Sequence, residues 1–353
     1  TVVDLEHLSG EINKLKSAGI AISPENLKIS DRAMIVFPFH KQQDVLEEQR
    51  LADKKYGSTK RGIAPVYSDK FQKKGVHMGE LLYPQKIKSH LESILEWKNL
   101  ILKNVYGADP YRLQDILAWT ECFGEILSPY ITDTGILLRK ANAEGKKILF
   151  EAQLGALRDI DYGIYPYTSS SNPLASYAPI GSGAPDLRVD EVVGVVKAYS
   201  TCVGEGPFTS EWFGEDADRL REAGGEYGAA TGRPRRVGPM DIVATNYGVQ
   251  VQGATCIALT KMDILSYLDK IPVCTAYEIN GQKTTDFPFH AILDEAKPVY
   301  EFLPGWKCDI SSVRNYEALP SEAREYVEYI EKKINCPIKY VSVGPGRDEI
   351  ILR

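Results

Sequence analysis

Residues 228–238 read GAATGRPRRVG and place three arginines, Arg233, Arg235 and Arg236, around Pro234. The fixed φ angle of proline restricts such a loop, so less entropy is lost when its arginines bind a ligand. Guanidinium groups bind carboxylates and phosphates through two hydrogen bonds at a time. The segment therefore predicts a site for a small anion, although a solvated basic turn or a nuclear-import signal has a similar composition.

A second candidate site is the segment ALTKMD at residues 258–263, which follows an apolar run beginning at Ala254. Lys261 and Asp263 are thus expected where a buried strand ends. A carboxylate there accepts hydrogen bonds from both N1–H and the exocyclic amine of guanine, and the lysine stem covers the face of the base. This arrangement would select GTP over ATP. An ordinary surface pair at the start of a helix has the same spacing.

Two further segments combine hydroxyl groups with glycine or asparagine. Residues 56–70, YGSTKRGIAPVYSDK, offer Ser58 and Thr59 together with free backbone N–H groups, which can hold a phosphate. Residues 164–172, IYPYTSSSN, contain four consecutive hydroxyl side chains before Asn172, which suits a sugar phosphate. Both compositions are also typical of ordinary turns.

Other chemical motifs are missing from the sequence. His40 and His290 each follow the residues FPF, a context typical of packed structural histidines. HExxH, GxSxG and GxxxxGK[ST] do not occur, nor does a Cys/His spacing that would bind a metal. The residues alone therefore assign neither a nucleophile nor a cradle for a triphosphate.

The overall composition limits the class of protein. With 42 basic and 48 acidic residues the net charge is −6, which disfavours general binding to nucleic acid or to a membrane surface. The six cysteines include no CxxC pair and are interpreted as reduced thiols. The sequence contains neither an apolar run long enough to span a membrane nor an opening typical of a signal peptide. We expect a cytoplasmic protein.

Hydrophobic periodicity predicts the elements that position these residues. Helices are expected over residues 5–19, 85–105 and 112–145, and strands over residues 34–40 and 146–156. β-branched runs within 190–208, 248–265 and 338–352 each reach a glycine or polar stop. Because open α/β sheets hold ligands where their strands end, these stops are candidate binding positions. We find no convincing linker, which favours a single domain.

Taken together, these segments resemble the adenylosuccinate synthetase family. The resemblance is carried, in the family's order, by GSTKRGIAPVYSDK, ILFEAQLGALRDIDYGIYPYTSSSN, KAYSTCVGEGPFTSE, TGRPRRVGPMD, ALTKMDIL, CTAYEING, YEFLPGW and SVGPGR. It implies a P-loop NTPase-like α/β fold with a large, mostly parallel central sheet flanked by helices, forming one domain over residues 1–353 and working as a homodimer. The implied reaction transfers the γ-phosphoryl group of GTP to O6 of IMP, after which L-aspartate displaces phosphate to give adenylosuccinate, with Mg²⁺ bridging the phosphates.

The resemblance also implies roles for individual residues. The IMP site would comprise Thr59, Lys73, Gln153, Ser169 and Arg233, with Lys73 reaching the neighbouring subunit's active site. L-aspartate would be bound by Ala229, Ala230, Thr231, Gly232, Arg233 and Arg235. GTP would be bound by Arg235, Lys261, Met262, Asp263, Ser342, Val343 and Gly344.

The sequence departs from the family pattern in several places. The family's opening GDEGKGK segment, with its proposed general base and magnesium ligand, and the histidine that acts as general acid are not present, so no catalytic residue or metal ligand is assigned. We expect the sequence to be part of a longer enzyme. The alternatives are that the missing segment lies on another polypeptide, or that the protein is a catalytically inactive relative that binds IMP or GTP. The family's FEGAQG reads FEAQLG, which places Leu154 at the IMP-binding glutamine position and Gln153 one residue earlier. Lys73 replaces an arginine, giving up a bidentate contact.

Overall fold

A computed structural model of the chain describes residues 1–228 and 232–353. These residues form two compact units. The first contains residues 1–153, 169–173 and 177–188, and the second contains residues 154–168, 174–176 and 189–353. The single domain expected over residues 1–353 concerns how the two units behave together, and it stays a prediction.

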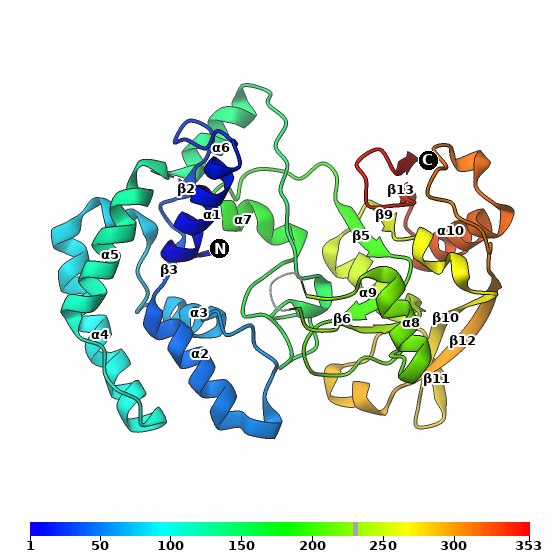
Figure 1. Cartoon of the computed structure of the whole chain (residues 1–353), viewed down its shortest axis with the longest axis horizontal. Coiled ribbons are helices and arrows are strands. Elements are labelled where there is room, and N and C mark those ends of the chain that lie inside the picture. The colour runs from blue at the N-terminus through cyan, green and yellow to red at the C-terminus, as the bar shows by residue number, and fades with distance from the viewer. Residues whose placement is uncertain (229–231) are drawn as a thin grey trace. The chain divides into compact units, whose positions relative to one another are not determined.

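The first unit is mainly helical (Figure 1). Its first helix, α1, begins after Asp4, whose carboxylate accepts a hydrogen bond of 3.1 Å from the His7 N–H, and it buries Leu5 and Ile12. Two short parallel strand pairs, β1 with β3 and β2 with β4, complete the unit. Its elements are α1 (Leu5–Ser17), α2 (Pro38–Leu51), α3 (Ile63–Gln72), α4 (Pro84–Tyr106), α5 (Leu113–Leu127), α6 (Thr134–Ala143), α7 (Ala178–Ser182), β1 (Val2–Asp4), β2 (Ile29–Ser30), β3 (Met34–Val36) and β4 (Ile131–Thr132).

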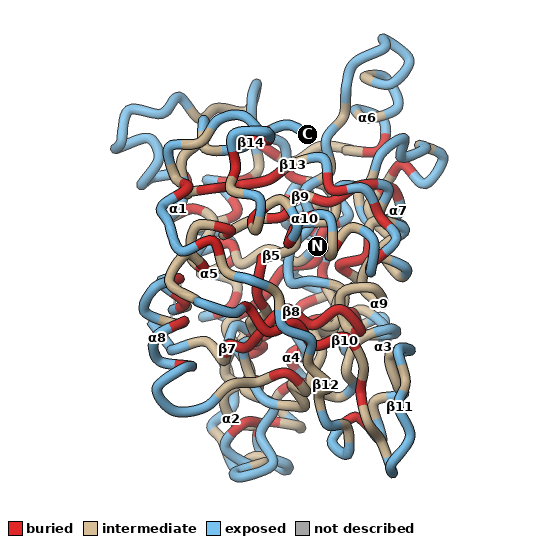
Figure 2. The backbone as a smooth tube through the Cα atoms, turned by 90° about the vertical axis from the view of Figure 1, so that its right-hand side faces the viewer, coloured by how far each residue is buried: buried red, intermediate tan, exposed pale blue. Residues whose placement is uncertain are grey.

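The second unit contains the longest strands. One sheet has the order β14-β13-β9-β5, in which β13, β9 and β5 are parallel and β14 is antiparallel. In another, β10 pairs with β11, β12 and β8, and Figure 2 shows the buried course of β8 and β10. Its elements are α8 (Gly214–Gly224), α9 (Ile242–Gln252), α10 (Ser321–Ile334), β5 (Val193–Lys197), β6 (Ser200–Cys202), β7 (Arg236–Gly238), β8 (Met240–Asp241), β9 (Cys256–Thr260), β10 (Lys270–Ile279), β11 (Gln282–Thr284), β12 (Lys297–Pro304), β13 (Ile338–Ser342) and β14 (Ile350–Leu352).

The α/β class and its parallel strands are confirmed. The three β-branched runs become β5, β9 and β13, which are neighbours in one sheet. The helix predicted over residues 112–145 is wrong in one respect, because it is divided into α5 and α6. Pro129 occupies a single 3₁₀ turn after α5, and the Asp133 side chain caps a new helix by accepting from the Ile136 N–H.

The strand predicted over residues 146–156 is also wrong. Residues 146–153 belong to no strand, and Leu149 is 90% exposed. An apolar run becomes a strand only where a neighbouring strand pairs with its backbone and another layer covers its side chains. The described structure provides neither for this run.

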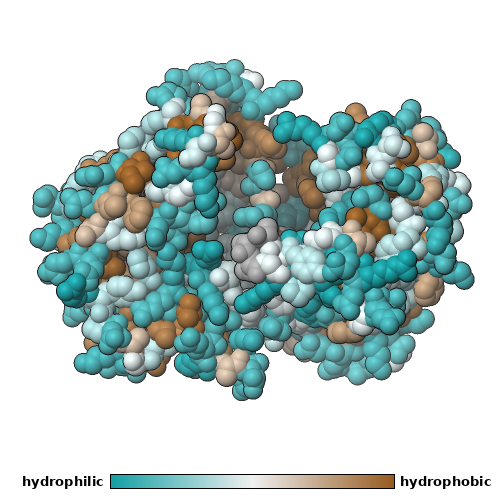
Figure 3. All heavy atoms as spheres, viewed as in Figure 1, coloured by the Kyte–Doolittle hydropathy of each residue, from teal (hydrophilic) through white to brown (hydrophobic). Residues whose placement is uncertain are grey.

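Hydrophobic residues are divided between buried clusters and small surface patches. On the face shown in Figure 3, brown hydrophobic patches are separated by teal hydrophilic residues. The core of the second unit includes Ile257 and Leu259 of β9 and Val341 of β13, all completely buried. Within residues 1–228 and 232–353, no helix is both long enough and apolar enough to cross a membrane.

Candidate functional site

The carboxyl ends of three parallel strands meet at one edge of the sheet in the second unit. Lys197, the last residue of β5, is in register with Thr260, the last residue of β9. The Met262 N–H, just after β9, donates to the Ser342 carbonyl at the end of β13 over 3.3 Å. Because parallel strands all end on the same side, side chains far apart in sequence gather at this edge.

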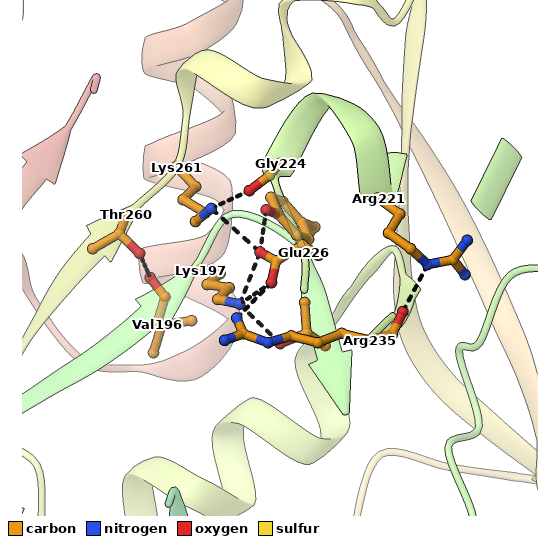
Figure 4. Close-up of polar contacts among 10 residues, drawn as sticks. Val196, Lys197, Arg221, Gly224, Glu226, Arg235, Thr260 and Lys261 are labelled. Carbon is orange, nitrogen blue, oxygen red and sulfur yellow. Dashed lines mark hydrogen bonds and ion pairs between the residues drawn. The ribbon is translucent and has the colours of Figure 1, made fainter. Parts of the chain in front are cut away.

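The carboxylate of Glu226 lies at the centre of this edge (Figure 4). Lys197 Nζ is 2.9 Å from both carboxylate oxygens, and the Tyr199 hydroxyl donates to Oε1 over 2.5 Å. Arg235 donates to Oε2 over 2.7 Å, and Lys261 Nζ lies 3.4 Å from Oε1. Glu226 itself is completely buried. We call these five residues the Glu226 cluster.

The Glu226 cluster carries more positive than negative charge. Burial raises the pKa of the Glu226 carboxyl, but hydrogen bonds from Tyr199 and Lys197 outweigh burial and lower this pKa to about 2. Burial also lowers the pKa of Lys197, and the neighbouring charges of Arg235 and Lys261 act in the same direction. One ionised carboxylate therefore faces three cationic side chains, an arrangement suited to an anionic ligand.

Asp263 presents a carboxylate oxygen with no internal donor. Its Oδ1 is buried and has no hydrogen-bond partner in the described structure. Burial raises the pKa of this carboxyl above its ordinary value. A buried acceptor without a partner is costly unless a ligand supplies a donor. The residue as a whole is only half-buried, so this side chain, at the start of the 3₁₀ turn Asp263–Tyr267, lies within reach of N–H groups of a bound molecule.

The turn after β13 lies next to this position. Ser342 Oγ donates to the Gly344 carbonyl over 2.8 Å. A Cβ at Gly344 would lie 2.5 Å from a carboxylate oxygen of Glu349, so a larger residue there would displace the end of the Glu349 side chain. Met262 and Val343, two of the residues predicted to bind GTP, are both fully buried.

The arginines of the loop have different surroundings. Arg235 belongs to the Glu226 cluster, and its backbone N–H donates to the Glu226 carbonyl over 2.9 Å. Arg236 is paired with Glu211 and donates to the Gly206 carbonyl over 2.7 Å, so it holds the loop in place. The Arg233 carbonyl accepts from the Gly228 N–H over 2.8 Å, and Gly232 has a φ of +63°. The predicted L-aspartate residues Ala229, Ala230 and Thr231 lie outside the described residues.

In the first unit, the predicted phosphate loop is held by two carboxylates of α2. Glu48 accepts hydrogen bonds of 3.1 Å from the N–H groups of Tyr56, Gly57 and Ser58. Asp44 accepts from Ser58 Oγ over 2.7 Å and from the Gly62 N–H over 2.9 Å. Thr59 lies between these anchors and is exposed. Its side chain is therefore presented to solvent by a fixed backbone.

Removing one anchor should loosen this loop. Asp44 is 5% exposed, so Asp44→Ala leaves the buried Gly62 N–H unsatisfied. We expect a loss of about 2 kcal/mol in the free energy of unfolding. Hydrogen exchange at Gly62 should become faster, while the exposed Asp53→Ala serves as control. Unchanged exchange at Gly62 in the Asp44 variant would show that Asp44 does not fix the loop.

The remaining IMP candidates lie on separate segments of the first unit. Lys73 is exposed and ends α3 with a φ of +62°. Ser169 is half-buried and lies 2.8 Å from Ser171, oxygen to oxygen. Gln153 and Leu154 are both exposed, and Leu154 has a φ of +81°. A positive φ alters the direction of the backbone between these neighbours, so simple strand alternation does not relate their side chains.

No metal site is formed by the described residues alone. Across residues 1–228 and 232–353, no group of three or more His, Cys, Asp or Glu side chains is arranged to hold an ion. Mg²⁺ at nucleotide sites commonly takes only one or two protein carboxylates beside the phosphate oxygens, and we assign none of the described side chains as its ligand. His40, as its sequence context predicts, is buried and bonded to Asp69 at 2.8 Å.

Comparisons with known proteins cover nearly the whole chain. A family model described as adenylosuccinate synthetase matches residues 1–351. The chain belongs to the adenylosuccinate synthetase family. It is 46% identical to the adenylosuccinate synthetase of Caldanaerobacter subterraneus subsp. tengcongensis, covering 99% of this chain and 82% of that protein. It is 45% identical to the enzyme of Halothermothrix orenii, covering 100% and 82% of the two chains.

A solved structure agrees with the sequence relatives. The fully ligated adenylosuccinate synthetase of Plasmodium falciparum superposes with a TM-score of 0.91 at 32% identity, covering all of this chain and 83% of the other. Members of this family are GTP-dependent ligases that use IMP and L-aspartate to make adenylosuccinate, and they generally use Mg²⁺.

Sequence reasoning missed part of the Glu226 cluster. Lys197 was visible as a lysine at the end of an apolar run, the same signal that identified Lys261. Glu226 and Tyr199 gave no such signal, because an isolated glutamate and tyrosine are common in any sequence. Their proximity follows only from the order of the strands.

Proposed function

We propose that the enzyme to which this chain belongs carries out the adenylosuccinate synthetase reaction, and that this chain supplies binding residues for IMP, GTP and L-aspartate. The observation that carries this proposal is the match to the family over residues 1–351. On this proposal the first unit contributes Thr59, Gln153 and Ser169 to IMP, and the second unit contributes the residues for GTP and L-aspartate.

The guanine base would be recognised by Asp263 and Lys261. A carboxylate oxygen without an internal partner suits the adjacent N1–H and amine donors of guanine. Adenine offers an acceptor at N1, so it would leave Asp263 unsatisfied. The backbone of residues 342–344 would line the same base, since the Ser342 carbonyl is bonded to the Met262 N–H.

L-aspartate and the nucleotide phosphates would be bound by the arginine loop. The substrates bring several negative charges together, and arginine side chains reduce their mutual repulsion. Arg235 would bind L-aspartate and GTP, and Arg233 would bind L-aspartate and IMP. Residues 229–232 would complete the L-aspartate site. Mg²⁺, when bound with the nucleotide, would neutralise phosphate charge.

Three further proposals concern the oligomeric state, the location and the domain organisation of the enzyme. The protein would act as a homodimer in which Lys73 contacts the IMP of the neighbouring subunit. Its location would be cytoplasmic, as the predicted reduced cysteines suggest. The two compact units would work together as one catalytic domain.

The direct test is an assay of the purified full-length protein with IMP, GTP, L-aspartate and Mg²⁺. We expect adenylosuccinate, followed by its absorbance and confirmed by chromatography, and we expect no product when any one substrate is omitted. ATP should support the reaction poorly. Binding of GTP and IMP without product would contradict the proposal and identify a non-catalytic relative.

A further inference from the structure

The Glu226 carboxylate connects residues from four segments of the second unit. Lys197 ends β5, Tyr199 precedes β6, Arg235 precedes β7 and Lys261 follows β9. Each of them donates to Glu226 or lies within ion-pair distance of it. Because Glu226 has no exposed surface, a substrate cannot reach it directly. Its role must be exerted through the side chains that it holds.

The two carboxylate oxygens hold different partners. Oε1 is shared by Tyr199 and Lys261, whereas Oε2 binds Arg235. Lys197 bridges both oxygens. One rigid planar group thus sets the distance between the lysine proposed for guanine and the arginine proposed for L-aspartate and GTP.

The backbone around Glu226 is shaped for these contacts. Gly224 gives room to the Tyr199 hydroxyl, because a Cβ at Gly224 would lie 2.3 Å from it. Lys261 Nζ also donates to the Gly224 carbonyl over 2.5 Å, and Lys261 has a φ of +62°. The Arg235 N–H reaches the Glu226 carbonyl over 2.9 Å. Side-chain and backbone bonds therefore converge on the same pair, Lys261 and Arg235.

We infer that Glu226 is a positioning residue that fixes Lys261 and Arg235 relative to each other, so that affinities for guanine nucleotide and L-aspartate depend on the same buried carboxylate. This inference rests on the proposed function. It assigns Glu226 no contact with substrate. The proposed IMP residues of the first unit are not bonded to Glu226, and Arg233 is not one of the five residues of the Glu226 cluster, so affinity for IMP should depend on Glu226 much less than the affinities for GTP and L-aspartate do.

Glu226→Gln removes the negative charge with little change in size. The amide would turn a donor towards Arg235 or Lys197, and the cations would lose their shared counter-charge. Although the site becomes more positive, Arg235 and Lys261 are no longer held in the geometry that binds a ligand. We expect the KM values for GTP and L-aspartate each to rise about tenfold or more, with the KM for IMP within about twofold of the wild type.

Two other variants sharpen the test. Glu222→Gln is the matched control, because Glu222 is an exposed carboxylate four positions away, and it should leave all three KM values unchanged. Tyr199→Phe keeps the carboxylate and removes one donor. It should raise the KM values for GTP and L-aspartate in the same direction as Glu226→Gln but by less, which provides an answer even where Glu226→Gln does not fold.

Binding of GDP, measured by calorimetry, separates this inference from the proposed function. Absence of adenylosuccinate from the wild type would contradict the proposed function, while weaker GDP binding by Glu226→Gln than by Glu222→Gln would still support the positioning role. Equal GDP affinities, an unchanged KM for GTP or L-aspartate, or an equal rise in all three KM values would overturn the inference. No binding of GDP by the wild type would overturn it as well.

Discussion

Replacing Asp263 by asparagine should remove most of the preference for GTP over ATP. We expect kcat/KM with GTP to fall about 100- to 1,000-fold, because an amide can accept one guanine N–H but opposes the other with its own N–H₂ donor. The rate with ATP should change little. Initial rates of adenylosuccinate formation with each nucleotide give the ratio directly.

The size of this effect follows from the surroundings of Asp263. Its Oδ1 is buried and has no partner among the residues that the structure describes, and burial holds the pKa of the carboxyl above its ordinary value. A buried acceptor that depends on the ligand for its hydrogen bond contributes strongly to binding, because no protein donor replaces the ligand N–H when that contact is lost. Asp309→Asn is the control, since Asp309 is exposed and accepts from the Ser311 N–H. A full preference for GTP in Asp263→Asn would remove Asp263 from the guanine site.

Strand ends were the part of the site that the sequence could predict. Lys261 and Asp263 follow an apolar β-branched run, and such a run predicts both a buried strand and the position where it ends. The family resemblance added Ser342 and Gly344. The parallel order of β5, β9 and β13 then brings these ends together, as an α/β fold requires.

Differences among like residues were beyond sequence reasoning. Arg235 and Arg236 are adjacent and chemically identical, yet one is held by the buried Glu226 and the other by Glu211. Which carboxylate each arginine meets depends on the alternation of side chains in a short strand and on the path of distant segments. The same applies to Glu226, whose importance comes from burial among donors that lie far along the chain.

Apolar composition also misled in one segment. Residues 146–153 have the pattern of a strand but no partner strand, and pairing depends on tertiary structure that local pattern does not contain. Pro129, by contrast, was a local signal for the break between α5 and α6. Because helical periodicity is present on both sides of Pro129, one continuous helix was predicted despite this signal.

The second large effect should be on stability, at a buried ion pair in the first unit. Asp69 accepts from Lys98 over 2.6 Å and lies 2.8 Å from His40, and all three side chains are buried. The Phe37 N–H donates to His40 Nδ1, which leaves Nε2–H to donate to Asp69. Burial lowers the pKa values of both Lys98 and His40. Asp69 therefore supplies the negative charge that keeps the Lys98 ammonium in the core.

Asp69→Asn should lower the free energy of unfolding by about 3–5 kcal/mol at pH 7, because it leaves a buried ammonium without a counter-charge. The folded-state pKa of Lys98, already lowered, would fall further, so the variant binds fewer protons folded than unfolded. The difference in free energy of unfolding between the wild type and the variant should therefore shrink as the pH rises from about 7 to 9 and Lys98 becomes neutral. Urea denaturation at both pH values measures this, with the exposed pair of Arg112 and Asp115 providing the control variant Asp115→Asn.

Removing both charges distinguishes an ion-pair effect from simple loss of packing. In Asp69→Asn with Lys98→Met, the core no longer contains an unpaired ammonium, and methionine fills much of the space of the lysine stem. We expect the double variant to be more stable than Asp69→Asn alone and to lose the pH dependence of its deficit. Equal stability of the double and single variants would mean that Asp69 acts through His40 and the α2–α3 contact rather than through Lys98. His40, Asp44 and Glu48 all lie on α2, and the two carboxylates hold the loop around Thr59. The same measurement therefore tests whether the stability of the helix that anchors this loop depends on the buried charges.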